Sequence, residues 1–221
     1  MLLRFPITVR VLRKQGEYNT MKKITEKKER SLGVKLFLKA DRCNSPKCVM
    51  VRRPTRPVQH GQRRHNVSEY GKQLQEKQKI QFLYGLSNRQ MAKLFQSSKD
   101  KEKIMQVLEH RLDRVVFLLG FTGSPRIARQ LISHGHIMVN GRKVTVPSFH
   151  VKIGDVISIR PESQSLKLFE GLLLKLKKYS SPEWLKLFPD EIKGECVKHF
   201  TLGQASQLPF DVNIVGEFYS R

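Results

Sequence analysis

The chain has 221 residues, with 42 Lys and Arg against 19 Asp and Glu, a formal net charge of +23 and a pI near 10.3. This charge indicates a polyanionic partner, with nucleic acid favoured over an acidic membrane surface. Three cysteines are too few for a disulfide scaffold and indicate a reducing compartment, and no apolar run approaches the roughly twenty residues that a membrane helix needs.

Residues 1–66 are predicted to form a basic, largely irregular arm. Residues 1–20 read as an organellar transit segment or as an extension upstream of the true start at Met21, and both readings stay open. Pro54 and Gly61 break any helix further along. The arginines of the arm are expected to order against RNA, with a non-specific basic tail as the alternative; they are Arg52, Arg53, Arg56, Arg63 and Arg64.

Residues 67–109 are predicted to form three helices. Ser68 suits the N-cap of the first, Gly85 interrupts it, and Ser87 suits the N-cap of the second. The third is expected at Lys101–Glu109 and leads into the segment that follows.

Residues 110–160 carry a structural signal at nearly every boundary. A first helix has an apolar stripe at helical spacing and should end at Gly120. Ser124 and Pro125 suit the N-cap and first position of a second helix, which Gly135 should end.

A hairpin is predicted directly after this second helix. Ile137–Val139 and Arg142–Val146 flank Asn140–Gly141, a pair that accepts the positive φ angles of a type I′ turn. A turn at residues 152–155 then leads into a strand at Val156–Ile159.

The second helix is expected to have a polar and cationic outer face, beside a hairpin tipped by Arg142 and Lys143. Arg126, Arg129, Gln130 and Ser133 recur at spacings that keep them neighbours on a helix. Guanidinium groups held in fixed directions bind phosphate oxygens in a bidentate way. The pattern therefore favours a phosphate-binding surface, with a merely solvated helix face as the alternative.

Beyond residue 160 the chain is predicted to be helical or irregular. An amphipathic helix is expected at Ser165–Tyr179, followed by a short helical turn at Ser181–Trp184 whose tryptophan enters the core. The tail is expected to be mostly loop, ending in a short strand or helix at Val212–Tyr219.

Three stretches in residues 110–160 resemble the RNA-binding module named after small-subunit ribosomal protein four; they read RLDRVVFLLGF, ARQLISHGHIMVNGRKV and GDVISI. The stretch HGQRRHNVSEYGKQLQEKQKIQFLYG and the end VGEFYSR are similar to the bacterial-type small-subunit ribosomal protein four family itself. These motifs follow the family's order and span roughly residues 27–221.

The resemblance implies an α+β fold in which a module of two helices on a short antiparallel sheet is inserted in a helical domain. The implied parts are the arm 1–66, the helical domain 67–109, the module 110–160 and a C-terminal segment 161–221 that packs back on the helical domain. The basic arm at the N-terminus is expected to be extended.

The resemblance also implies direct binding to the 5′ domain of small-subunit rRNA, early assembly of the subunit body, and a contribution to translational accuracy. Implied partners are neighbouring small-subunit proteins, especially the fifth, and mRNA near the path by which it enters. No cofactor, membrane, small-molecule substrate or enzymatic activity is expected, and the expected location is the ribosome, in the cytoplasm or an organelle.

Residues that we expect to contact RNA come from the arm, from the family's first motif and from the module. They are Arg52, Arg53, Arg56, His60, Arg63, Arg64, Tyr70, Gln73, Lys77, Gln78, Lys79, Arg111, Arg126, Arg129, Gln130, Ser133, His134, Asn140, Arg142 and Lys143. The chain departs from the family pattern at Val58, where glycine is usual, and at Ile80–Gln81, usually a more basic pair.

Arg111-Leu112-Asp113 also resembles the signature of pseudouridine synthases, whose aspartate is the nucleophile. Only about sixty residues follow the module, too few for the catalytic domain of such an enzyme. A free-standing RNA chaperone or an RNA-modification accessory with the same module remains the alternative function.

Cys43 and Cys48 are the candidate metal ligands, although we expect no metal. Structural zinc needs four ligands, and the pair supplies two. Some members of the family carry four cysteines here, but this chain lacks the upstream two, and His60 and His65 could stand in for them.

Overall fold

The computed structural model describes residues 26–38, 40–43, 45–54, 67–98, 100–201, 203 and 208–220. Within them lie, in chain order, α1 Glu26–Leu32, α2 Ala40–Cys43, α3 Val49–Arg52, α4 Glu69–Leu83, α5 Asn88–Ser97, α6 Lys101–Glu109, α7 Leu112–Leu118, α8 Pro125–Ser133, β1 Ile137–Val139, β2 Arg142–Lys143, β3 Val156–Ile159, α9 Pro161–Gln164, the 3₁₀ turn η1 Lys167–Phe169, α10 Leu172–Lys177, β4 Leu185–Phe188, β5 Lys193–Cys196 and α11 Val212–Ser220. The α+β class is confirmed. Where one domain ends and the next begins stays a prediction.

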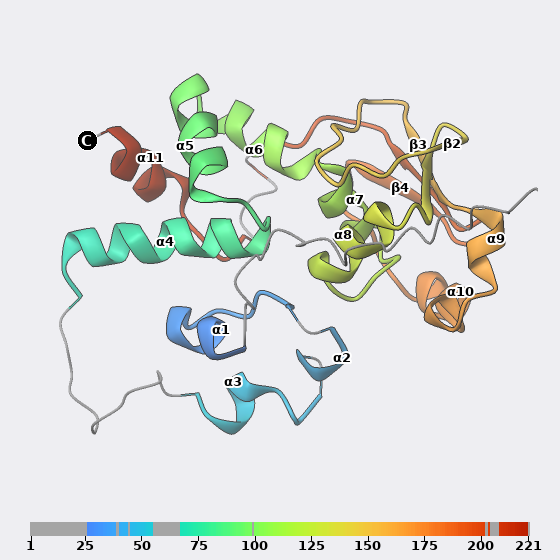
Figure 1. Cartoon of the computed structure of the whole chain (residues 1–221), viewed down its shortest axis with the longest axis horizontal. Helices are drawn as coiled ribbons and strands as arrows, with labels where there is room; N and C mark the ends of the chain where they lie inside the picture. The colour runs from blue at the N-terminus through green and yellow to red at the C-terminus, as the bar shows by residue number, and fades with distance from the viewer. Residues whose placement is uncertain are drawn as a thin grey trace, which may run out of the picture.

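The helices α4 and α5 lie at one end of the molecule, α6 leads from them toward α7, and the last helix, α11, packs along α4 (Figure 1). The Ser68 hydroxyl accepts the Gly71 N–H at 3.2 Å at the start of α4. Ser87 and Gln90 form a reciprocal capping box at the start of α5. The three helices predicted for residues 67–109 are confirmed.

The predicted helix pair and hairpin of residues 110–160 are also confirmed. Gly120 and Gly135, which follow α7 and α8, both have φ of +77°, a backbone conformation that favours glycine. Asn140 and Gly141 have φ of 49° and 75°, as a type I′ turn requires. The second hairpin strand is shorter than predicted, since β2 spans only Arg142–Lys143.

The sheet contains two strands that the sequence analysis missed. Its order is β2-β1-β3-β5-β4, all neighbours antiparallel, and β3 pairs with β5 through Ile157 opposite Gly194. The expectation of a helical or irregular segment after residue 160 is therefore wrong for residues 185–188 and 193–196. The helix predicted over Ser165–Tyr179 is also interrupted, because Gly171 adopts φ of +69° between η1 and α10.

The expectation of a largely irregular arm is wrong for residues 26–52, which contain α1, α2 and α3. Leu32, Leu36 and Leu38 of this segment are buried in the same core as the other helices. One oxygen of the buried Glu29 carboxyl accepts the N–H groups of Leu36 and Leu38, each at 3.1 Å. Burial raises the pKa of Glu29, while these backbone donors lower it. Buried leucines join the segment to the core, and local hydrogen bonds to Glu29 fix its shape. Neither feature shows as a periodic pattern in the sequence.

Candidate nucleic-acid interface

The outer face of α8 carries polar and cationic side chains on a firmly held helix. Ser124, fully buried, caps it, because its hydroxyl accepts the Arg126 N–H at 3.3 Å and donates to the Leu38 carbonyl at 3.2 Å. Ala128, Leu131 and Ile132 bury the inner face. Arg126, Gln130, Ser133 and His134 are exposed on the other side.

The hairpin tip adjoins the C-terminal end of α8. Arg142 and Lys143 are both exposed, and the Lys143 side chain passes so close over Gly135 that a Cβ there would collide with it. Asn140 braces the turn, since its Nδ2 donates to Asp155 Oδ1 and its Oδ1 accepts the Val156 N–H, both at 2.8 Å. We call the exposed set of Arg126, Gln130, Ser133, His134, Arg142 and Lys143 the module surface.

Arg129 lies elsewhere than expected. Its guanidinium donates to Asp113 Oδ2 at 2.6 and 3.1 Å, to the Gly85 carbonyl at 2.7 Å and to the Tyr84 carbonyl at 2.9 Å. Arg111 also donates to Asp113, at 2.7 and 3.0 Å. The expectation that Arg129 belongs to the outward cationic face is wrong. A helix position at the edge of the polar stripe can turn its side chain inward where a buried acceptor is in reach.

On α4, the candidates differ in exposure because α11 covers part of the helix. Tyr70 is 55 % exposed and lies against Phe218, with ring centroids 5.8 Å apart. Gln73 is buried, and its Nε2 donates weakly to Glu217 at 3.5 Å. The Lys77 Nζ lies 4.4 Å from the Phe218 ring centroid, and burial lowers the pKa of Lys77.

The remaining α4 candidates, Gln78 and Lys79, are half-buried. Lys79 forms an ion pair with Glu76 at 2.5 Å. Arg52 and Arg53 are exposed at the end of α3. Arg56, His60, Arg63 and Arg64 lie outside the described residues, as do the predictions made for residues 1–25.

Sequence reasoning missed a buried charged group that joins α4, α6 and α7. The Tyr84 hydroxyl donates to Glu109, and Arg114 Nε donates to the other Glu109 oxygen at 3.0 Å. Burial, together with the Glu109 carboxylate, raises the pKa of Tyr84 well above its ordinary value, so the phenol remains a donor. The available signal was three polar side chains on otherwise apolar helix stripes.

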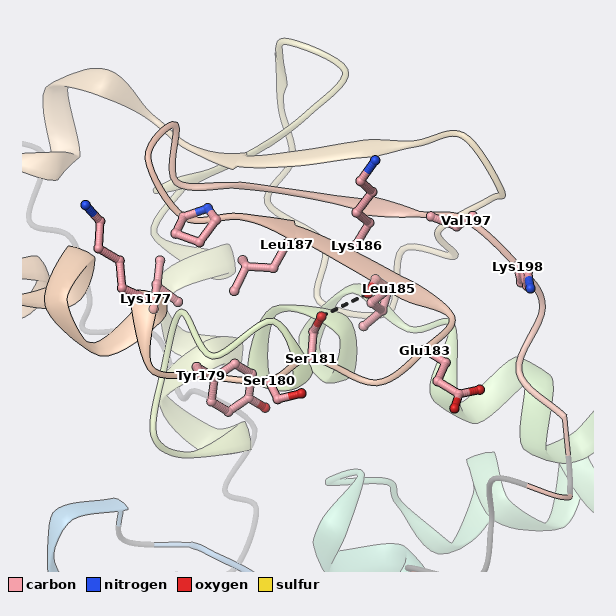
Figure 2. A pocket seen from close by; sticks show the side chains of 12 residues that line it. Lys177, Tyr179, Ser180, Ser181, Glu183, Leu185, Lys186, Leu187, Val197 and Lys198 are labelled. Atoms are coloured by element: carbon pink, nitrogen blue, oxygen red, sulfur yellow. Dashed lines mark hydrogen bonds between the residues drawn. The ribbon is translucent and has the colours of Figure 1, made fainter.

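The arrangement around Asp113 does not suit a nucleophile. Asp113 is 4 % exposed, and both carboxylate oxygens accept guanidinium hydrogen bonds. The hollow in Figure 2 lies beside α10 and β4, is lined by Leu187 and Lys186 among others, and does not include Asp113. A buried carboxylate that is paired with two arginines and lies outside the hollow gives no support to a pseudouridine synthase activity.

The two candidate metal ligands, Cys43 and Cys48, are both buried. The Cys43 thiol lies 3.9 Å from a Glu29 oxygen. Within the described ranges, no group of three or more His, Cys, Asp or Glu side chains is arranged to hold a metal ion. None of the helices in those ranges is long and apolar enough to cross a membrane.

Comparisons with known proteins cover most of the chain. A family model described as the ribosomal protein S4/S9 N-terminal domain matches residues 10–114, and one described as the S4 domain matches residues 110–157. Proteins named small ribosomal subunit protein uS4 are similar to this chain: 45 % identical over 197 residues in Thermus thermophilus, 43 % over 194 in a Thermoanaerobacter species and 40 % over 194 in Thermotoga petrophila. Each alignment spans 86 % of this chain and 93 % of the relative. The chain belongs to the uS4 family of small ribosomal subunit proteins.

Proposed function

We propose that this protein is a structural constituent of the small ribosomal subunit that binds small-subunit rRNA directly, through the module surface and the exposed side chains of α3 and α4. The observation that carries the proposal is the placement of three exposed cations, Arg126, Arg142 and Lys143, on one module. Ser124 caps the helix that carries Arg126, and Asn140 braces the turn before Arg142. Membership in a family of small ribosomal subunit proteins supports small-subunit rRNA as the partner.

The physical basis of binding is phosphate contact at fixed positions. Arg126 and Arg142 supply guanidinium forks, and Lys143 supplies a point charge. Gln130 and Ser133 add neutral hydrogen-bonding groups that suit phosphate or 2′-hydroxyl oxygens. Such a set reads the shape of folded RNA rather than its base sequence.

The proposal extends to the role in the subunit. The RNA is the 5′ domain of the small-subunit rRNA, and binding there nucleates assembly of the subunit body. Contact with the fifth small-subunit protein, near the path by which mRNA enters, contributes to translational accuracy. No enzymatic step is part of this function, in line with the buried and paired Asp113.

The test is binding of the full chain to protein-free 5′-domain RNA at several salt concentrations. The double variant Arg126→Glu with Arg142→Glu should bind more weakly, and its salt dependence should flatten by about one unit per lost phosphate contact. Lys93→Glu with Lys103→Glu, on α5 and α6, is the charge-matched control, because both side chains are exposed and lie outside the module surface. An unchanged slope in the double variant, or an equal loss in the control, would contradict the proposed surface.

A second measurement separates this function from a free-standing RNA chaperone. A constituent of the subunit should be present at near one copy per small subunit after sedimentation at high salt. A chaperone should be found mainly outside that fraction.

A further inference from the structure

One group of hydrogen bonds joins the module to the helical part of the molecule. Arg129 projects from α8, Asp113 lies in the first turn of α7, and Tyr84 and Gly85 form the turn where α4 ends. Figure 1 shows α7 and α8 next to that end of α4. We call this group, with Arg111, the Arg129 cluster.

The geometry of the Arg129 cluster favours one orientation of α8 relative to the end of α4. The guanidinium is planar, and it donates to a carboxylate on one side and to two backbone carbonyls on the other. A planar fork that meets acceptors on two elements fixes both the distance and the angle between them. The buried group of Tyr84, Glu109 and Arg114 forms a second connection nearby, and it also starts at the end of α4.

A direct phosphate contact by Arg129 conflicts with this geometry. Its side chain is 22 % exposed and Asp113's is 6 % exposed. If Arg129 swung outward, the two carbonyls and one side of the Asp113 carboxylate would lose their donor in a largely buried place. Removing one partner from a buried, hydrogen-bonded charge pair is strongly unfavourable.

We propose that Arg129 is a positioning residue, which together with Asp113 holds the module surface at a fixed orientation to α4. This inference rests on the proposed function. The exposed Tyr70 on α4 and Arg126 on α8 then belong to two separate contact areas with a set angle between them. A protein of this form binds most tightly to RNA in which two helical segments are themselves held at a matching angle. It binds a single straight duplex more weakly, because only one contact area can be used.

The test uses a substitution for which the change in charge and the loss of orientation have opposite effects on RNA affinity. Asp113→Asn removes a negative charge from an RNA-binding protein, so charge alone predicts equal or tighter binding to any RNA. Loss of the fixed orientation predicts weaker binding to RNA with a fixed helical junction. If only one molecule in about ten then holds the competent orientation, the apparent Kd for that RNA rises roughly tenfold.

The measurement compares the full chain and Asp113→Asn on two probes: protein-free 5′-domain RNA and a straight RNA duplex of the same length. The 5′-domain RNA is the junction-containing probe. We expect Asp113→Asn to bind it more weakly than wild type does, with an unchanged salt slope, and to bind the duplex as tightly as wild type does. A direct phosphate contact predicts a different result for Arg129→Ala, namely a slope lower by about one unit on both probes.

Arg129→Lys serves where Asp113→Asn does not fold, because it keeps the charge but cannot reach acceptors on two elements at once. It should show the same selective loss on the junction-containing RNA. The inference is overturned if either folded variant keeps the wild-type ratio of the two affinities. If the wild-type chain itself has no preference for the junction-containing RNA, the proposed function fails and the inference falls with it. These two failures are therefore distinguishable.

Discussion

Gly194 of β5 lies directly against the side chain of Leu119 at the end of α7, so closely that a Cβ at this position would collide with Leu119. This contact places the hairpin of β4 and β5 against the end of α7, which lies more than seventy residues earlier in the sequence. The sheet and the helix pair are therefore packed as one unit.

Gly194→Ala should destabilise the protein. The added methyl group enters a filled core, where overpacking costs about 1–3 kcal/mol. Thermal or denaturant unfolding measures the loss. Gly216→Ala is the control, because a Cβ there meets nothing within 4 Å and the residue lies inside α11. That substitution should stabilise the helix by about 0.5–1 kcal/mol. Equal stability of wild type and Gly194→Ala would show that the contact is looser than described.

Tyr84→Phe should also lower the free energy of unfolding. The phenol donates to Glu109, and without it one oxygen of a buried carboxylate loses its partner while Arg114 still holds the other. The cost of leaving such a group unsatisfied is about 1–3 kcal/mol. Tyr70→Phe, at an exposed ring, should change stability little and serves as the comparison. A neutral result for Tyr84→Phe would mean that water replaces the hydroxyl.

Stability should fall as the pH drops below the range in which histidine is neutral. His110 is buried, its Nδ1 lies 3.0 Å from the Val151 carbonyl, and its Nε2 accepts the Phe200 N–H at 3.3 Å. One ring nitrogen must therefore carry the proton and the other must be bare. Burial lowers the pKa of His110, and the nearby His150 and His199 lower it further.

The folded-state pKa of His110 lies below its unfolded value of 6.5. The contribution of the neutral ring to stability is therefore fully present above pH 6.5, and it is lost as the pH falls from 6.5 through the folded-state pKa. Unfolding measured from pH 8 to pH 5 should show this decline. His110→Gln should flatten it in part, since burial also lowers the pKa of His150. A curve that His110→Gln does not change would contradict the assignment.

Local chemistry made much of the fold predictable. Ser68, Ser87 and Ser124 begin helices because their hydroxyls cap backbone N–H groups, and Asn140–Gly141 turns because both residues accept positive φ. These signals act within a few residues, so the sequence shows them directly.

Non-local contacts were not predictable in this way. Strand β5 has the sequence Lys-Gly-Glu-Cys, which alone has no strand signal, and it forms because β3 and β4 pair with it on both sides. Arg129 differs from Arg126 only in which acceptors lie within reach, and those acceptors belong to residues 16 to 45 positions away. The family resemblance identified the RNA-binding module, but it could not separate surface arginines from structural ones.

The most direct test of the account places a photo-cross-linking amino acid at position 126 or 142, with position 103 as the control, and binds each full chain to protein-free 5′-domain RNA. Strong RNA cross-links are expected from positions 126 and 142, and background levels from position 103. Background levels from 126 and 142, with strong cross-links from 103, would contradict the account, because the RNA would then lie on a different face of the molecule.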